Sequence, residues 1–114
     1  AARELVQHAG IKVLQVDIVL GGGYTPWVKM AAVAAAHHVY IAPHGATFTE
    51  LAAPFVAAMP NSIYVDGFPQ GEPNEVWSRL YVEPLELRDG TAFLRDAPGL
   101  GLEFDEAFLA AHLP

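Results

Sequence analysis

The stretch KVLQVDIVLGGGYTPWVKMAAVAAAHHVYIAPHG, residues 12–45, decides the fold of this chain. Its opening has an apolar residue at every even position from Leu14 to Leu20, which is the two-residue period of a β-strand. The odd positions are mixed and include Asp17. We therefore predict a strand over residues 12–20, with one face under helices and the other open to a polar centre.

The rest of the stretch predicts a helix and a second strand. The glycines at 21–23 break the first strand, and Thr25 followed by Pro26 is typical of an N-cap and a first helical residue. We expect this helix to end at about His37. The apolar residues 39–43 then predict a short strand that ends at proline.

The flanking residues extend this alternation. A helix is predicted over residues 1–9. Thr47 and Glu50 resemble a capping box for a helix that continues to about residue 59, although Pro54 should kink that helix or delay its start. Residues 62–66 predict a third strand. Helices and strands that alternate with short connections indicate parallel βα units, so the predicted fold class is α/β.

The pattern changes after residue 67. Three local elements are expected there: a short helix around residues 75–80, a hairpin with strands at 85–87 and 91–94, and a last helix from the cap Asp105 to about His112. The hairpin signal is strong because Asp89-Gly90 favours a tight two-residue turn.

Composition limits the class of protein. The hydrophobic fraction of 53% is enough for a buried core, and the absence of cysteine excludes disulfides and thiolate metal sites. The net charge is −7, with eleven of the thirteen carboxylates from Glu50 onward, which argues against a nucleic-acid surface. Apolar runs such as residues 31–36 are too short to span a membrane. We predict a cytoplasmic protein with neither nucleic-acid nor membrane partners.

Each of the three predicted strands carries an ionisable residue in or near its last part: Asp17 lies within the first, His44 just past the second and Asp66 at the end of the third. Each is followed by glycine within a few positions. The C-terminal strand ends of a βα barrel converge on the active site, so we predict that these three residues form one site. Each also has a structural interpretation when taken alone, as a solvated carboxylate, a loop histidine and a turn former, respectively.

Two further motifs carry less weight. The glycines at 21–23 lead into a helix, but the glycine spacing of dinucleotide-binding loops and the P-loop lysine are absent. His37 and His38 are adjacent rather than four residues apart, so they do not predict a zinc helix. We interpret both of them, and His8 and His112, as structural.

Four segments occur in the order seen in the enolase superfamily: DIVLGGGYT at 17–25, APHG at 42–45, PNSIYVD at 60–66 and DAPGLG at 96–101. Together they resemble its mandelate racemase and acid-sugar dehydratase branch. The resemblance implies the C-terminal part of a modified TIM (β/α) barrel that is incomplete in this chain. Residues 1–83 would supply the sixth to eighth strands, and residues 84–114 would return to a capping domain.

The resemblance also implies a reaction and three catalytic residues. Enzymes of this family abstract a proton alpha to a carboxylate, and a magnesium ion stabilises the enediolate. His44 would exchange the proton, while Asp17 would orient its ring and stabilise the imidazolium. Asp66 stands where the family usually has glutamate, an acid that hydrogen-bonds the substrate carboxylate or the enediolate.

Among the family's reactions we favour a magnesium-dependent sugar-acid dehydratase that acts on a small-molecule acid. The alternatives are a racemase or epimerase of a 2-hydroxy acid and a non-catalytic scaffold. The family's base on the second strand and its three carboxylate ligands for Mg²⁺ have no counterpart here, so metal ligands are expected outside this chain. We accordingly expect the chain to require an absent N-terminal portion, to be inactive alone and to act in a homo-oligomer.

Overall fold

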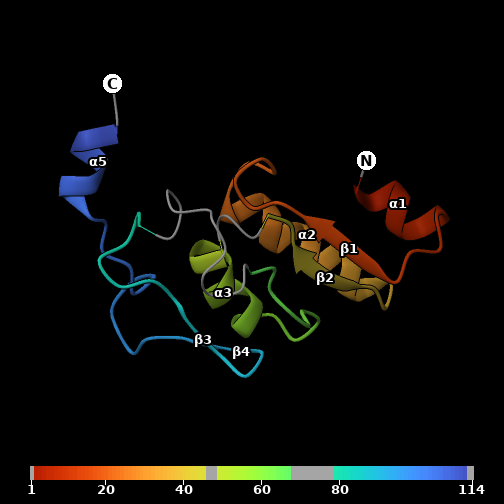
Figure 1. The fold of residues 1–114 in the computed structure, drawn as a ribbon. Helices are drawn as coiled ribbons and strands as arrows, with labels where there is room; N and C mark the ends of the chain where they lie inside the picture. Colours follow the sequence, from red (N-terminus) through yellow and green to blue (C-terminus); the bar gives the residue numbers. More distant parts are fainter. Residues whose placement is uncertain (1, 46–48, 68–78, 113–114) are drawn as a thin grey trace.

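The computed structural model describes residues 2–45, 49–67 and 79–112 (Figure 1). Its helices and strands are, in chain order, α1 (Ala2–His8), β1 (Val13–Val16), α2 (Tyr24–Ala36), β2 (Tyr40–Pro43), α3 (Thr49–Ala58), β3 (Glu86–Arg88), β4 (Thr91–Phe93) and α5 (Glu106–His112). Helices and strands alternate as far as α3, which confirms the predicted mixed α/β class.

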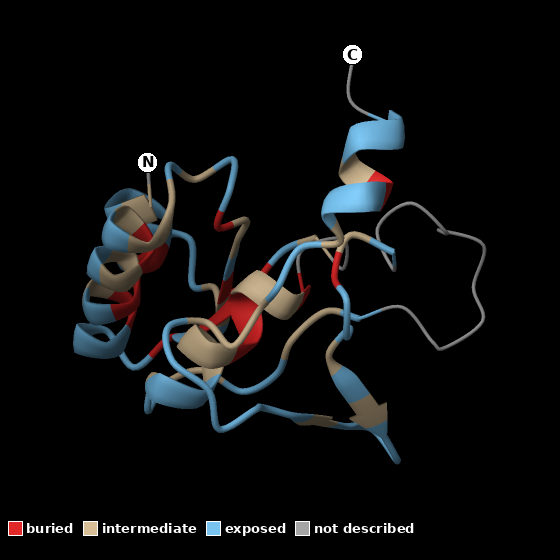
Figure 2. Cartoon of the chain, turned by 90° about the vertical axis from the view of Figure 1, so that its left-hand side faces the viewer, coloured by how far each residue is buried: buried red, intermediate tan, exposed pale blue. Residues whose placement is uncertain are grey.

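The core lies against the sheet formed by β1 and β2. These strands are parallel, and Val13 pairs with Tyr40 at one end while Val16 pairs with Pro43 at the other. Helices α2 and α3 contact β2, and α1 contacts α2. The largest side chain in this core is Trp27 of α2, which is fully buried. Figure 2 shows that most buried residues gather around this sheet and the helices that pack on it.

The first strand is shorter than predicted because the chain turns at Asp17. The Asp17 carbonyl accepts the Gly21 N–H at 2.9 Å, and its Oδ1 accepts the Leu20 N–H at 2.7 Å. These bonds replace a strand ladder with a local turn, as aspartate side chains often do. Leu20, predicted to face the core, is 86% exposed. The strand prediction was therefore correct as far as Val16 and wrong beyond it.

Helix α2 begins two residues earlier than predicted. Gly23, with φ of 93°, is the N-cap in place of Thr25, and the Trp27 N–H donates to the Gly23 carbonyl at 3.3 Å. Pro26 lies in the first turn, where an N–H has no partner within the helix, so the proline costs nothing there. The buried residues Trp27, Ala31 and Ala34 form one stripe at helical spacing.

The predicted third strand is reduced to a single bridge between Ile41 and Ser62. The Ile41 N–H donates to the Asn61 carbonyl at 2.9 Å, and the Ser62 hydroxyl donates to the Ile41 carbonyl at 2.9 Å. The next donor on β2 would be Pro43, which has no N–H, so the ladder cannot continue along this edge.

Helix α3 contains Pro54 and begins at Thr49. The helix therefore starts before Pro54, and the delay that the proline could have caused is not observed. The capping residue proposed for it, Thr47, lies outside the described residues.

The hairpin and the last helix follow the prediction closely. Strands β3 and β4 are antiparallel, and the turn residues Asp89 and Gly90 have φ of 51° and 75°, as a tight primed turn requires. Asp105 Oδ1 accepts the Phe108 N–H at 2.9 Å and so caps α5. The helix expected at residues 75–80 falls mainly outside the described residues.

Candidate functional site

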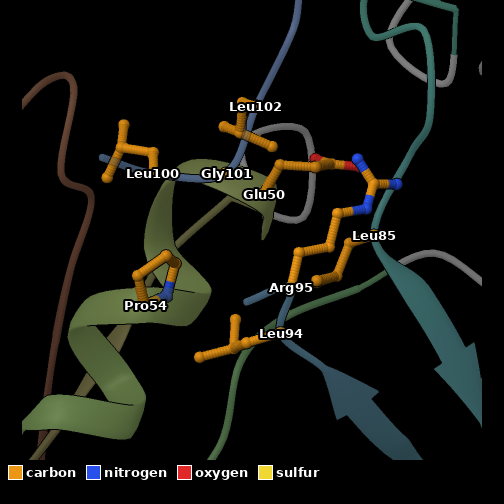
Figure 3. Close-up of a pocket in the computed structure, with 8 residues that line it drawn as sticks. All are labelled: Glu50, Pro54, Leu85, Leu94, Arg95, Leu100, Gly101 and Leu102. Carbon is orange, nitrogen blue, oxygen red and sulfur yellow. The ribbon is translucent and has the colours of Figure 1, made fainter. Parts of the chain in front are cut away.

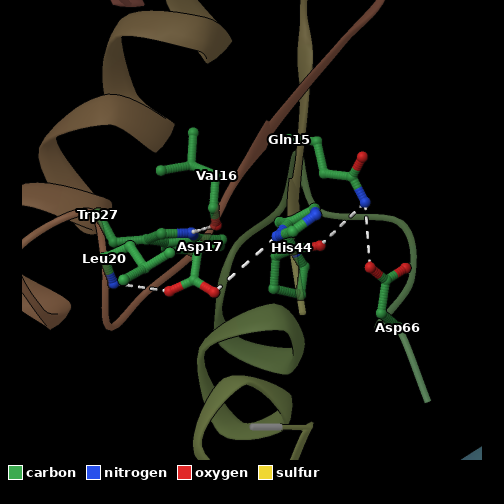
Figure 4. Close-up of polar contacts among 8 residues, drawn as sticks. Gln15, Val16, Asp17, Leu20, Trp27, His44 and Asp66 are labelled. Atoms are coloured by element: carbon green, nitrogen blue, oxygen red, sulfur yellow. Dashed lines mark hydrogen bonds and ion pairs between the residues drawn. The ribbon is translucent and has the colours of Figure 1, made fainter. Parts of the chain in front are cut away.

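Asp17 and His44 leave the sheet side by side. Val16 and Pro43 are the last pair of the parallel ladder, so the next residue of each strand emerges at the same sheet end. The His44 Nδ1 lies 3.9 Å from Asp17 Oδ2 (Figure 4). Parallel strand ends supply catalytic groups in βα proteins, and two predicted site residues are adjacent at such an end.

The Asp17 carboxylate is fixed by its own loop. Its Oδ1 accepts the Leu20 N–H, and the side chain is only 12% exposed. This leaves Oδ2 directed toward His44. Gly45 provides the space for Oδ2, because a Cβ at Gly45 would lie 2.8 Å from it. The same glycine has φ of 93°, a conformation that residues with a side chain rarely adopt.

The backbone of His44 is fixed by a hydrogen bond, whereas its imidazole ring is exposed. Its N–H donates to the Val16 carbonyl at 3.2 Å, while its side chain is 63% exposed. The 3.9 Å between ring and carboxylate is longer than a hydrogen bond. Acid/base contacts are often long in free enzymes and tighten when substrate binds. The exposed ring can therefore meet a bound molecule while Asp17 lies behind it.

One backbone carbonyl connects this pair to the core. The Val16 carbonyl accepts the His44 N–H and also the indole N–H of Trp27, the latter at 2.9 Å. Trp27 is fully buried. The most deeply buried aromatic side chain thus helps to position the strand end that carries the site.

Asp66 lies at the same end of the sheet but contacts a different residue. The Gln15 Nε2 donates to Asp66 Oδ2 at 3.1 Å (Figure 4), and the Thr49 hydroxyl donates to the Asp66 carbonyl. No hydrogen bond or ion pair joins Asp66 to Asp17 or His44 within the described part of the chain. The site therefore consists of an Asp17–His44 pair and a Gln15–Asp66 pair.

Gln15 is the residue that the site prediction missed. It lies on β1 two positions before Asp17, and residues two apart on a strand share a face. The sequence signal was therefore a polar residue of the same parity as Asp17.

The remaining histidines have structural surroundings. His112 Nδ1 lies 2.8 Å from the Phe108 carbonyl, and its ring stacks on Phe108 with centroids 4.1 Å apart. His37 is the C-cap of α2, and His38 follows it with φ of 57°. Over residues 2–45, 49–67 and 79–112, no three His, Asp or Glu side chains come together in a way that could hold a metal ion.

A small, partly open hollow lies between α3 and the C-terminal segment (Figure 3). Four of its eight lining residues are leucine and two are charged, Glu50 and Arg95, and none is a predicted site residue. Arg95 Nη2 is already bonded to the carbonyls of Glu83 and Pro84 at 2.8 and 2.9 Å.

Burial raises the pKa of Tyr81 to about 12, and the charges of Glu50 and Tyr24 add to the shift.

The fold and the site together define an α/β protein with an acid/base pair at its strand ends. The protein has parallel βα units with an Asp/His pair where two adjacent strands end, an arrangement suited to proton transfer. No helix among the described residues is long and apolar enough to cross a membrane.

Comparison with known families gives the particular assignment. The model of the enolase C-terminal domain-like family matches residues 1–108, and the chain belongs to that family. A D-galactarolactone cycloisomerase from Agrobacterium fabrum is 34% identical over 114 residues, which cover 90% of this chain and 29% of that protein. An L-talarate/galactarate dehydratase from Salmonella typhimurium is 34% identical over 93 residues, which cover 82% of this chain and 21% of that protein.

Solved structures agree with this assignment. The L-talarate dehydratase from Polaromonas sp. JS666, complexed with Mg and L-glucarate, superposes with a TM-score of 0.76 at 30% identity. The match covers 96% of this chain and 28% of that one. A mandelate racemase/muconate lactonizing enzyme from a marine actinobacterium shares the fold with a TM-score of 0.85 at 24% identity, covering 96% of this chain and 30% of that one. The chain thus spans less than a third of the length of these relatives.

Proposed function

We propose that this chain supplies the acid/base side of the active site of a sugar-acid dehydratase. The observation that carries the proposal is the Asp17–His44 pair at two adjacent strand ends, with 3.9 Å between Oδ2 and Nδ1. Its support from relatives is that several are dehydratases of sugar acids, among them enzymes for talarate, galactarate and mannonate. Small acids are thus the substrate class.

The chemistry assigned to these residues is proton transfer. In the first step His44, as neutral imidazole, takes the proton from the carbon alpha to the substrate carboxylate, and the electron pair of the broken C–H bond remains as an enediolate. In the second step the imidazolium so formed gives this proton to the departing hydroxyl, which leaves as water. Asp17 orients the ring and stabilises its charged form. Asp66, as a carboxylic acid, donates a hydrogen bond to the substrate carboxylate or to the enediolate.

The residues described here do not form a magnesium site. By resemblance to the family, whose three carboxylate ligands stand on earlier strands, we place the Mg²⁺ ligands outside this chain, and no step assigned to this chain passes through the metal. Residues 1–83 would be the last strands and helices of an enolase-type barrel, and residues 84–114 would return to a capping domain. In this arrangement the activity requires an N-terminal portion in addition to this chain, and the working form is a homo-oligomer.

The test is His44→Ala in the complete protein, with exchange of the alpha proton measured by NMR in D₂O. Loss of a general acid/base group should reduce exchange by a factor on the order of 10²–10⁴. His38→Ala is the matched control, because His38 is an exposed histidine at the end of α2. Exchange at the normal rate in His44→Ala would overturn the assignment of this histidine.

Isomerisation is the second candidate, because the Agrobacterium fabrum relative is a cycloisomerase. Incubation of the complete protein with a panel of acid sugars and Mg²⁺ separates the two reactions. A dehydratase yields 2-keto-3-deoxy acids and releases water, whereas a racemase or epimerase yields a stereoisomer of unchanged mass. A protein with no exchange on any acid would be a scaffold rather than an enzyme.

A further inference from the structure

We propose that Gln15 is a positioning residue that holds the Asp66 carboxylate beside the strand ends carrying Asp17 and His44. This proposal rests on the proposed function and adds a residue to it. Gln15 projects from β1, whereas Asp66 follows the segment bridged to β2. The contact between them spans 51 positions of sequence and crosses β2.

The hydrogen-bonding partners fix the orientation of the Gln15 amide. Its Nε2 lies 3.1 Å from Asp66 Oδ2 and 3.5 Å from the Pro43 carbonyl oxygen. Both partners are acceptors, and an amide nitrogen carries two hydrogens, so the nitrogen rather than the oxygen must face them. The bond to Asp66 is the shorter of the two and lies within the normal range for an N–H···O hydrogen bond. The second bond is long and connects the same nitrogen to the last residue of β2.

Asp66 needs such a partner because little else directs its carboxylate. The Thr49 hydroxyl binds the Asp66 backbone carbonyl and so fixes the main chain at this point. The β-ladder has ended by then, because it consists of one bridge at Ser62. Gln15 is therefore the described residue that fixes the side chain itself. Its bond to Oδ2 leaves Oδ1 of Asp66 to carry the hydrogen that a substrate oxygen accepts.

The central experiment is a double-mutant cycle in the complete protein with Gln15→Ala, Asp66→Ala and the double variant. A residue that acts only through Asp66 should lower kcat by up to about tenfold, as loss of one hydrogen bond predicts, with KM nearly unchanged. The same substitution should then have little effect when Asp66 is already absent. Gln7→Ala is the matched control, since Gln7 is an exposed glutamine on α1.

Equal losses from Gln15→Ala in the presence and absence of Asp66 would overturn the proposal, because they would show that Gln15 acts on substrate or on the fold directly. A rise in KM alone would do the same. Melting temperatures of all variants identify any that do not fold. If Asp66→Ala does not fold, the outcome is decided by a second measurement that needs no turnover.

The second measurement uses selective ¹⁵N labelling of glutamine, with the Gln15 amide signals assigned by their loss in Gln15→Ala. These signals should shift in Asp66→Asn and stay in place in Asp96→Asn, a control at an exposed aspartate. Signals that do not respond to Asp66→Asn would overturn the contact. This result is independent of catalysis, so it also separates the two proposals. Normal exchange in His44→Ala would refute the proposed reaction, whereas the Gln15 signals report only on the hydrogen bond between Gln15 and Asp66.

Discussion

The two halves of the described chain are built in different ways. Residues 2–67 contain all but two of the buried apolar side chains and every residue of the candidate site. Residues 79–112 contribute only Tyr81 and Phe108 to the buried set, and their hairpin and helix are short. The first half is held together by a buried core between segments far apart in sequence. The second has local turns and caps and one distant pairing, in which the Val82 N–H donates to the Glu103 carbonyl and the Asp105 N–H donates to the Leu80 carbonyl, each at 2.9 Å.

This difference separates what positions the site from what surrounds it. In residues 2–67 a core substitution should disturb the strand ends, because Trp27 and His44 share the Val16 carbonyl. In residues 79–112 a substitution should act near its own position, as expected where a cap or turn stabilises a single element. The predictions that follow are ordered by the size of the expected effect, and each compares the two halves.

The largest effect is expected from Trp27→Ala. Truncation of a fully buried aromatic side chain should lower the free energy of unfolding by about 3–5 kcal/mol, measured by urea unfolding. Hydrogen exchange should rise in β1, α2 and β2 together. Phe104→Ala is the comparison in the second half, where Phe104 is half exposed and should cost much less. Equal costs for the two would contradict the contrast between the halves.

The second prediction concerns the pH dependence of the free energy of unfolding and its origin in Tyr81, which lies where the two halves meet. Burial, Glu50 and Tyr24 raise the pKa of Tyr81 from 10.0 to about 12, so the folded state keeps its proton where the unfolded chain has lost it. This contribution is complete below pH 10 and disappears as pH rises through the folded value, with a total of about 3 kcal/mol. Urea unfolding across this range should show the decline, and Tyr81→Phe should lessen it. An unchanged slope in Tyr81→Phe would exclude Tyr81 as its source.

The third prediction compares two glycines with positive φ. Gly90→Ala, in the hairpin, meets no heavy atom within 4 Å and should cost only the backbone term of about 1–2 kcal/mol. Gly45→Ala has the same backbone term and also forces Asp17 Oδ2 away from a new Cβ. It should therefore lower alpha-proton exchange in the complete protein, which Gly90→Ala should leave intact. Equal exchange rates would show that the position of Asp17 does not matter to the reaction.

The smallest effect is expected from Asp105→Ala. Loss of this N-cap should cost about 1 kcal/mol, because the Phe108 N–H loses its acceptor. Hydrogen exchange should rise within α5 and remain constant in β1 and β2. Asp96→Ala is a suitable control, since Asp96 is exposed and lies outside the helix. Faster exchange in β1 would mean that the two halves are more strongly coupled than their packing indicates.

Elements fixed by local chemistry were predictable from the sequence. Asp89-Gly90 required positive φ at both positions, and Asp105 offered a capping oxygen three residues before the donor that it binds. Neither depends on distant residues. The order of helices and strands in residues 2–67 was also predictable, because burial sets the period of apolar residues.

Features that depend on residues distant in sequence could not be predicted in the same way. The end of β1 depends on whether Asp17 binds its own loop, and the loss of the third strand depends on Pro43 in the neighbouring strand. The Asp17–His44 pair could be predicted because both residues end strands. Strand parity indicated only that Gln15 shares a face with Asp17. Its contact with Asp66 could not be predicted, since it arises only when Asp66 is folded back against β1.

The shared carbonyl of Val16 gives this protein a built-in optical probe. Indole fluorescence depends on the hydrogen bond and the polarity around the ring, and the Trp27 N–H is bonded to the same oxygen as the His44 backbone. A shift of that strand end should therefore change the emission of a residue that lies in the core. With Trp77, the other tryptophan of this chain, and any tryptophan of the N-terminal portion replaced by phenylalanine, the response of the site to an acid sugar could be followed without a label.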